Sequence, residues 1–276
     1  MNVESASSLI TDNMSRQSYR PEDCYPNVVN VKEKYLGPYI PYVGKSYFTT
    51  YPRLLIYGMA QNLSQGGGKG LIDAWLDKPD KGIRRLYYDA PDMHMRLWDS
   101  GNLKVIAALA LTCYPRSNFK PTANVYELVA VTNFVKFSFY RDKQGKRLDS
   151  NPPKQIYDVM WEHYCKYEVD ILQPNVIIGC SKDITATICR NLDKKKYPGV
   201  KFLGIPFPLM PQLARWVHDG NERVKNEKYD PTKAISEMQA LMVGTPDKDG
   251  SIRKTIRVNW YYFCEMKSRF IDACRS

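Results

Sequence analysis

Short apolar runs alternate with helix-like apolar stripes along most of the middle of this chain. Four short runs, each ended by a loop signal, predict buried strands at 53–60, 125–131, 175–178 and 200–208. Apolar residues at helical spacing predict helices at 100–115 and 152–174, and a further helix follows the third strand. Strands that alternate with helices favour a three-layer α/β/α fold with a central, mostly parallel four-stranded sheet.

The two ends of the chain depart from this alternation. Residues 1–30 are polar and rich in Ser and Asn, which predicts a loosely held arm. Residues 31–220 hold the predicted α/β domain. Residues 221–276 are expected to form a C-terminal extension that packs on the same domain, although the pattern gives them no place in the sheet.

The charge balance points to a polyanionic partner. The chain has 276 residues and a formal net charge of +11, which favours nucleic acid over a merely soluble basic protein.

Seven scattered cysteines without a C-x-x-C pair predict reduced thiols and a cytoplasmic setting, with no structural zinc. The apolar run at 105–111 is too short to cross a bilayer, so no membrane contact is expected. A monomer is expected.

Ligands of parallel sheets lie beyond the carboxyl ends of the strands, which singles out the loops at 59–70, 132–138, 179–183 and 205–210. The glycine-rich first loop is not a P-loop, because Gly70 follows Lys69 where Ser or Thr is needed. Dinucleotide, zinc-deaminase and G-x-S-x-G motifs are also absent. His163, inside a predicted helix, is interpreted as a packing or surface residue.

Four motifs occur in a fixed order. They are GMAQN (58–62) with GGGKG (66–70), VTNFVKF (131–137), ILQPNVIIGCSKDITATI (171–188) and FPL (207–209). With these motifs the chain resembles the uracil-DNA glycosylase superfamily over residues 51–216. The resemblance implies that fold, and a monofunctional DNA glycosylase that flips a damaged or modified base out of DNA and hydrolyses its glycosidic bond. Bases of foreign DNA, such as phage DNA, are one substrate class that it suggests.

The resemblance also assigns roles to residues. Base binding is expected at Gly58, Met59, Ala60, Asn133, Phe134 and Phe207, and DNA-backbone binding at Gly67, Gly68, Lys69, Ser181, Lys182 and Pro208. The chain departs from the family where Ala60 replaces the acid of the first loop and Phe207 replaces a histidine. Catalysis is therefore assigned to Asp89 or Asp92, with Gln61 and Asn62 orienting the water and Asp183 as the second choice. No metal or cofactor is expected, because the cysteines do not match the spacing of the iron–sulfur branch.

Simpler interpretations of the same residues stay open. Asn133 would suit a turn cap, residues 66–68 a flexible loop, and Phe207 a core position. Lys136 and Lys182 would suit solvated charges. Two rival functions also remain: a catalytically inert module of the same fold that binds nucleic acid or nucleotides, and a nucleotide- or sugar-processing enzyme.

Overall fold

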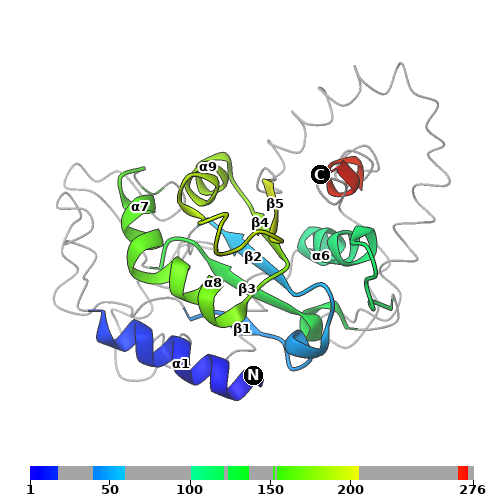
Figure 1. Ribbon diagram of the computed structural model, residues 1–276, viewed down its shortest axis with the longest axis horizontal. Helices are drawn as coiled ribbons and strands as arrows, with labels where there is room; N and C mark the ends of the chain where they lie inside the picture. The colour runs from blue at the N-terminus through cyan, green and yellow to red at the C-terminus, as the bar shows by residue number, and fades with distance from the viewer. Residues whose placement is uncertain are drawn as a thin grey trace, which may run out of the picture.

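A computed structural model of the chain describes residues 1–17, 40–59, 101–120, 124–136, 152, 154–204 and 267–272. Its centre is a five-stranded sheet in the order β1-β3-β2-β4-β5 (Figure 1). The strands are β1 (Tyr42–Val43), β2 (Leu54–Gly58), β3 (Val129–Asn133), β4 (Val176–Gly179) and β5 (Lys201–Gly204). All neighbours are parallel except β1, which pairs antiparallel with β3. The predicted α/β fold with a mostly parallel sheet is confirmed.

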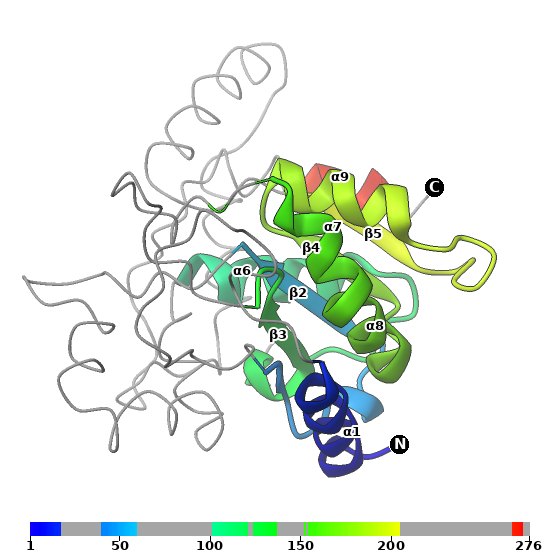
Figure 2. The same ribbon diagram turned by 90° about the vertical axis from the view of Figure 1, so that its left-hand side faces the viewer.

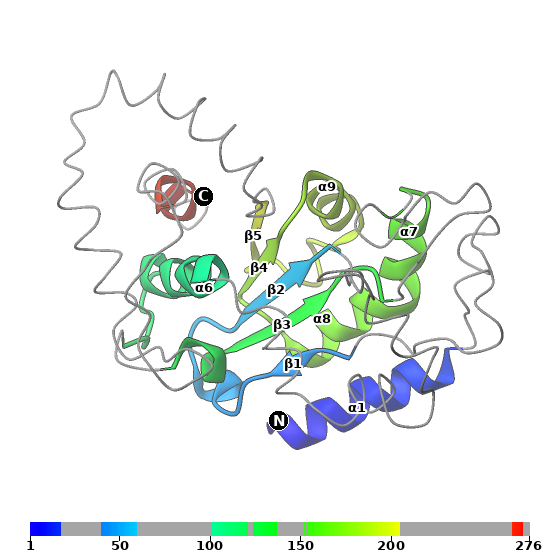
Figure 3. The ribbon, with the colours of Figure 1, turned by 180° about the vertical axis from the view of Figure 1, so that it is seen from behind.

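Helices cover both faces of this sheet. They are α1 (Val3–Arg16), α6 (Gly101–Cys113), α7 (Ile156–Met160), the π-helical turn η3 (Trp161–Cys165), α8 (Lys166–Leu172) and α9 (Lys182–Asn191). Leu54 and Ile56 of β2 pack in a core with α6, whereas Leu55 and Tyr57 pack in a second core with α1 and α7–α9. Figures 2 and 3 show α6 on one side of the sheet and α7–α9 on the other. Phe270, in a helical turn at 267–272, joins the α6 core.

The N-terminal segment is a packed helix, so the prediction of a loosely held arm is wrong for the residues of α1. Asn2 caps the helix by accepting a hydrogen bond from the Ser5 backbone N–H at 2.8 Å. Ala6, Ile10 and Met14 are spaced four residues apart and are all buried in the core that faces α8. Such a narrow stripe is hard to detect, because most other positions of the helix are polar and the apolar Leu9 is exposed.

Two strand predictions also need correction. The four-strand prediction missed β1, because two residues are too few to show a periodic pattern. The second strand begins at Val129, four residues later than predicted, because Val125–Leu128 form a 3₁₀ turn, η2. The side chain of Asn124 caps this turn by accepting a hydrogen bond from the Tyr126 backbone N–H. As a result, Asn133 is the last residue of β3 and does not follow it.

The helix predicted at 152–174 is present but interrupted. It runs from α7 through η3 to α8, and the wider π-helical turn rotates the face that meets the sheet. Trp161 and Cys165 are therefore buried, although neither lies on the apolar stripe expected for a regular helix. π-helical turns of this kind often lie at functional sites.

Close packing of α9 against β5 depends on Gly204. A Cβ at this position would lie 2.4 Å from Oγ1 and 2.5 Å from Cγ2 of Thr185, so no rotation of that side chain would relieve the clash. Gly204→Ala is expected to lower the free energy of unfolding by about 1–3 kcal/mol, as overpacking usually does. Chemical denaturation tests this, with Gly199→Ala as the control because a Cβ there meets nothing within 4 Å. Equal stabilities for the two variants would contradict the prediction.

Candidate functional site

The carboxyl ends of the four parallel strands meet at one edge of the sheet. Gly58 of β2 lies opposite Asn133 of β3, and Gly179 of β4 lies opposite Gly204 of β5. The pairing of the first two segments continues beyond the strands, because the Phe134 backbone N–H donates to the Gly58 carbonyl at 2.8 Å. The prediction that these strand ends converge is confirmed, and we call this edge the carboxyl edge.

Asn133 is the most unusual polar group at the carboxyl edge. Its residue surface is 2% exposed, and Oδ1 has no hydrogen-bond partner in the part of the chain that the structure describes. A buried polar atom left without a partner costs about 1–3 kcal/mol, so most proteins avoid one. An unpartnered amide oxygen of this kind is suited to a ligand that donates a hydrogen bond.

Phe134 does not have the position that base stacking requires. The side chain is fully buried on the α8 side of the sheet. Its ring packs edge-on against Tyr57, with centroids 5.4 Å apart, and tilted against Tyr157 at 5.8 Å. With both neighbours in place, Phe134 has no free face for a base, so the structure makes it a core residue. Met59, also predicted to bind the base, is partly buried against the same core.

The start of α9 lies at the carboxyl edge and holds three predicted residues. Ser181 caps the helix, since its Oγ accepts a hydrogen bond from the Ile184 backbone N–H at 3.1 Å. Lys182 is exposed, as either a solvated charge or a phosphate contact requires. Asp183, the second choice for the catalytic acid, forms an ion pair with Lys154 at 3.1 Å.

The remaining predicted site residues lie outside the described part of the chain, so their geometry is not part of the site described here. They are Gln61, Asn62, Asp89 and Asp92 of the catalytic set, Ala60 and Phe207 of the base-binding set, and Gly67, Gly68, Lys69 and Pro208 of the backbone-binding set.

A buried ion pair contacts Thr132, the residue before Asn133, and the sequence analysis missed it. Lys136 and Glu168 are each 1% exposed, and Lys136 Nζ lies 2.5 Å from Glu168 Oε1. The interpretation of Lys136 as a solvated charge is therefore wrong. One signal was present: Lys136 follows Phe134 by two residues and Glu168 follows Tyr164 by four, so each charge occupies a position expected to be apolar.

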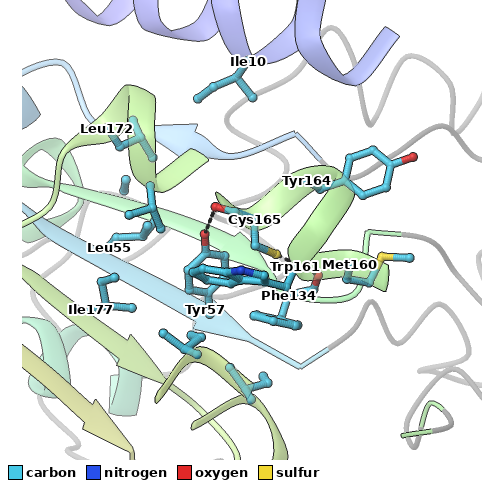
Figure 4. Close-up of a cluster of buried hydrophobic side chains, with 14 of the residues drawn as sticks. Ile10, Leu55, Tyr57, Phe134, Met160, Trp161, Tyr164, Cys165, Leu172 and Ile177 are labelled. Atoms are coloured by element: carbon cyan, nitrogen blue, oxygen red, sulfur yellow. Dashed lines mark hydrogen bonds between the residues drawn. The ribbon is translucent and has the colours of Figure 1, made fainter. Parts of the chain in front are cut away.

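The ion pair belongs to a wider polar cluster inside the core on the α8 side. Tyr57 donates its hydroxyl hydrogen bond to Glu168 Oε2 at 3.0 Å and to the Cys165 carbonyl at 3.2 Å. The Lys136 ammonium also lies 5.6 Å from the centroid of the Tyr57 ring. Figure 4 shows Tyr57 and Phe134 beside Cys165 of η3, with the hydrogen bond between the Tyr57 hydroxyl and the Cys165 carbonyl.

Burial controls the protonation of this cluster. Removal from water raises the pKa of Glu168, and the neighbouring Lys136 ammonium opposes that rise. Burial likewise raises the pKa values of Tyr57 and Cys165 well above their usual range. Both groups are therefore neutral hydrogen-bond donors at physiological pH.

Burial raises the pKa of Glu168 and Lys136 lowers it, so removing Lys136 should change how stability depends on pH. Without its partner in Lys136→Met, the folded-state pKa of Glu168 should rise further above the unfolded value. A raised carboxyl pKa contributes stability below the unfolded value, and that contribution is lost as pH rises through the folded value. The stability difference between wild type and Lys136→Met should therefore grow from about pH 5 to about pH 8, measured by urea unfolding. A difference that stays constant over this range would contradict the assignment.

Other features of the described residues concern metal ligands, membrane spans, thiols and one histidine. No group of three or more His, Cys, Asp and Glu side chains gathers at one place in the described segments, and no helix there is long and apolar enough to span a bilayer. The four cysteines at 113, 165, 180 and 189 are free thiols. His163 lies in η3 and is partly buried, and burial lowers its pKa.

No family model, curated protein or solved structure matches the chain in the comparisons. The fold that the described residues establish is an α/β fold with a five-stranded, mostly parallel sheet flanked by helices.

Proposed function

We propose that this protein is a DNA glycosylase with a uracil-DNA glycosylase-like three-layer fold, which excises a damaged or modified base and leaves an abasic site. The observation that carries the proposal is Asn133, a buried amide with an unpartnered oxygen at the carboxyl edge. This edge is where parallel sheets bind their ligands. An Asn amide both donates and accepts along one plane, as the edge of a nucleobase does.

Asn133 has two tasks in this proposal. It recognises the flipped base by hydrogen bonds to the base edge, which is how base-flipping enzymes read their substrates. Cleavage of the glycosidic bond leaves negative charge on the departing base, and the Asn133 amide N–H₂ stabilises that charge as it develops. Gly58 lies opposite Asn133 and has no side chain, so a base can come close to the end of β2.

The net charge and the position of α9 support a DNA partner. Lys182 is exposed at the N-terminal end of α9, where backbone N–H groups and the helix dipole favour a phosphate. The formal charge of +11 adds a longer-range attraction to a polyanion. The water-activating group is assigned to Asp89 or Asp92, with Gln61 or Asn62 orienting the water and Asp183 as the second choice. The free, scattered thiols favour a reducing, cytoplasmic setting.

The direct test is base release from duplex and single-stranded oligonucleotides. The substrates carry uracil, mismatched bases, or hydroxymethylated or glycosylated cytosine, and alkali cleavage of the product detects abasic sites. Base release from at least one substrate is expected. If DNA binds but no base is released from any substrate, the protein is the inert binding module and the enzyme proposal is wrong.

Salt dependence separates a DNA partner from a small-molecule substrate. The logarithm of the DNA association constant should fall linearly with the logarithm of salt concentration, by about 0.9 for each phosphate contact in a duplex. Fluorescence anisotropy with labelled duplex measures the slope. Affinity that does not change with salt, together with tight binding of a free nucleotide, would favour a nucleotide-processing enzyme.

A further inference from the structure

The two residues that flank Asn133 are held by hydrogen bonds from the buried cluster. Lys136 Nζ donates to Thr132 Oγ1 at 2.8 Å, and the Thr132 hydroxyl donates in turn to the Asn133 carbonyl at 3.4 Å. On the other side of Asn133, the Cys165 thiol donates to the Phe134 carbonyl at 3.4 Å. The carboxyl end of β3 is thus fixed from the direction of η3 and α8.

The ion pair completes this arrangement. Lys136 has its ammonium bonded to Thr132 and paired with Glu168, and its backbone N–H contacts Met160 Sδ at 3.3 Å. Glu168 is in turn fixed by the Tyr57 hydroxyl from β2. β2, β3 and the α7–η3–α8 helix therefore meet at one buried cluster, which contacts Thr132, the residue before the proposed base-binding amide.

A buried ion pair is a poor way to stabilise a protein. The cost of removing two charges from water commonly equals or exceeds their attraction, and apolar residues of similar volume often serve as well. The pair can, however, fix the geometry of its neighbours, because each hydrogen bond from Lys136 or to Glu168 holds one partner atom in place. Hydrogen bonds and ion pairs inside a core make their surroundings rigid in a way that apolar contacts do not.

We infer that Lys136 and Glu168 are positioning residues, which hold Asn133 in the orientation that base recognition requires, with Thr132 as the link. The inference rests on the proposed function. Neither residue is assigned a catalytic role, because Lys136 and Glu168 are already engaged with each other, with Thr132 and with Tyr57. Their effect on base release passes through the backbone and side chain of Asn133.

The main test uses the double variant Lys136→Met/Glu168→Leu, which removes both charges and keeps the apolar volume. Single-turnover base release gives two values, an amplitude that reports the folded, active fraction and a rate constant that reports the site. We expect a normal amplitude, an unchanged affinity for DNA and a rate constant lower by about 10²-fold, the effect of a displacement of about 1 Å at a reacting group. A rate constant equal to that of wild type would overturn the inference.

A matched pair at Thr132 tests the link while Lys136 and Glu168 both stay in place. Thr132→Ser keeps the hydroxyl and is expected to retain most of the rate, whereas the nearly isosteric Thr132→Val removes it and is expected to lower the rate. Equal rates for the two variants would remove Thr132 from the inference. Leu111→Ala is the control for loss of stability alone, because Leu111 is fully buried in the α6 core on the other face. It should lower the amplitude at most.

A measurement without substrate separates this inference from the proposed function. The side-chain amide resonances of Asn133, assigned by their loss in Asn133→Ala, are compared among wild type, the double variant and Leu111→Ala. We expect them to shift or broaden only in the double variant. If wild type releases no base, the proposed function is wrong, and unmoved resonances in the double variant would overturn the positioning role independently.

Discussion

Asn133→Ala is expected to lower the single-turnover rate of base release by about 10²- to 10³-fold, the usual effect of removing one preorganised donor from an active site. Its free energy of unfolding should stay close to that of wild type. The reason is that Oδ1 of Asn133 has no partner among the described residues, so its removal takes away a buried polar atom that costs free energy. Base release measures the first effect and urea unfolding the second.

Asn124→Ala is the matched control for this variant. Asn124 lies just before η2, upstream of the amino end of β3, where its side chain caps the turn. Its loss should cost about 1 kcal/mol of stability and leave the rate of base release unchanged. Normal base release by Asn133→Ala would remove the main support for the proposed function. A large loss of stability in that variant would show that Asn133 is a structural residue.

Glu168→Leu should lower the free energy of unfolding by about 3–5 kcal/mol at neutral pH, the cost of leaving a buried charge without its partner. The substitution leaves the Lys136 ammonium buried without its counter-ion, since Glu168 is the only carboxylate paired with it in the described segments. The aliphatic side chain of Leu fits an apolar core, so the loss comes from charge and not from a cavity. Urea or thermal unfolding gives the value.

The double variant Lys136→Met/Glu168→Leu serves as the control for the charge effect. Removing both charges should restore most of the stability lost in Glu168→Leu, because an apolar pair of similar volume packs about as well as a buried ion pair. If the double variant is as unstable as Glu168→Leu, the loss arises from packing. In that case the ion pair is not the origin of the effect.

Sequence patterns predicted the central strands of the sheet better than the strand boundaries and the edge strand. Runs such as the one that became β2 are continuous, apolar and bounded, so their burial on both faces followed directly. The start of β3 was missed because the cap at Asn124 is a local hydrogen bond that hydrophobicity does not record. β1 was missed because a two-residue strand that pairs with the distant β3 leaves no periodic pattern. In the same way, α1 was missed because its three buried residues, Ala6, Ile10 and Met14, stand in a mostly polar segment.

At the candidate site, too, the sequence predicted some residues correctly and others wrongly. Asn133 was identified from its place after an apolar run, and the structure puts it at the carboxyl edge beside Gly58. Phe134 was assigned to base stacking because it is aromatic and adjacent, but strand alternation carries it to the opposite face, into the core. Lys136 was interpreted as solvated, because a single charge in a sequence gives no sign of a distant partner.

The sequence by itself determined the α/β class, the parallel strands and the place of Asn133 at a strand end, because these depend on local hydrophobic patterns of short period. Only the tertiary structure decided that Lys136 meets Glu168, 32 positions away in the chain, and that Asn133 is buried with an unpartnered oxygen. Both depend on the rotation that η3 gives to its helix and on the register between β2 and β3. Such contacts arise between segments distant in sequence, and their physical effect appears only when folding removes the charges and amides from water.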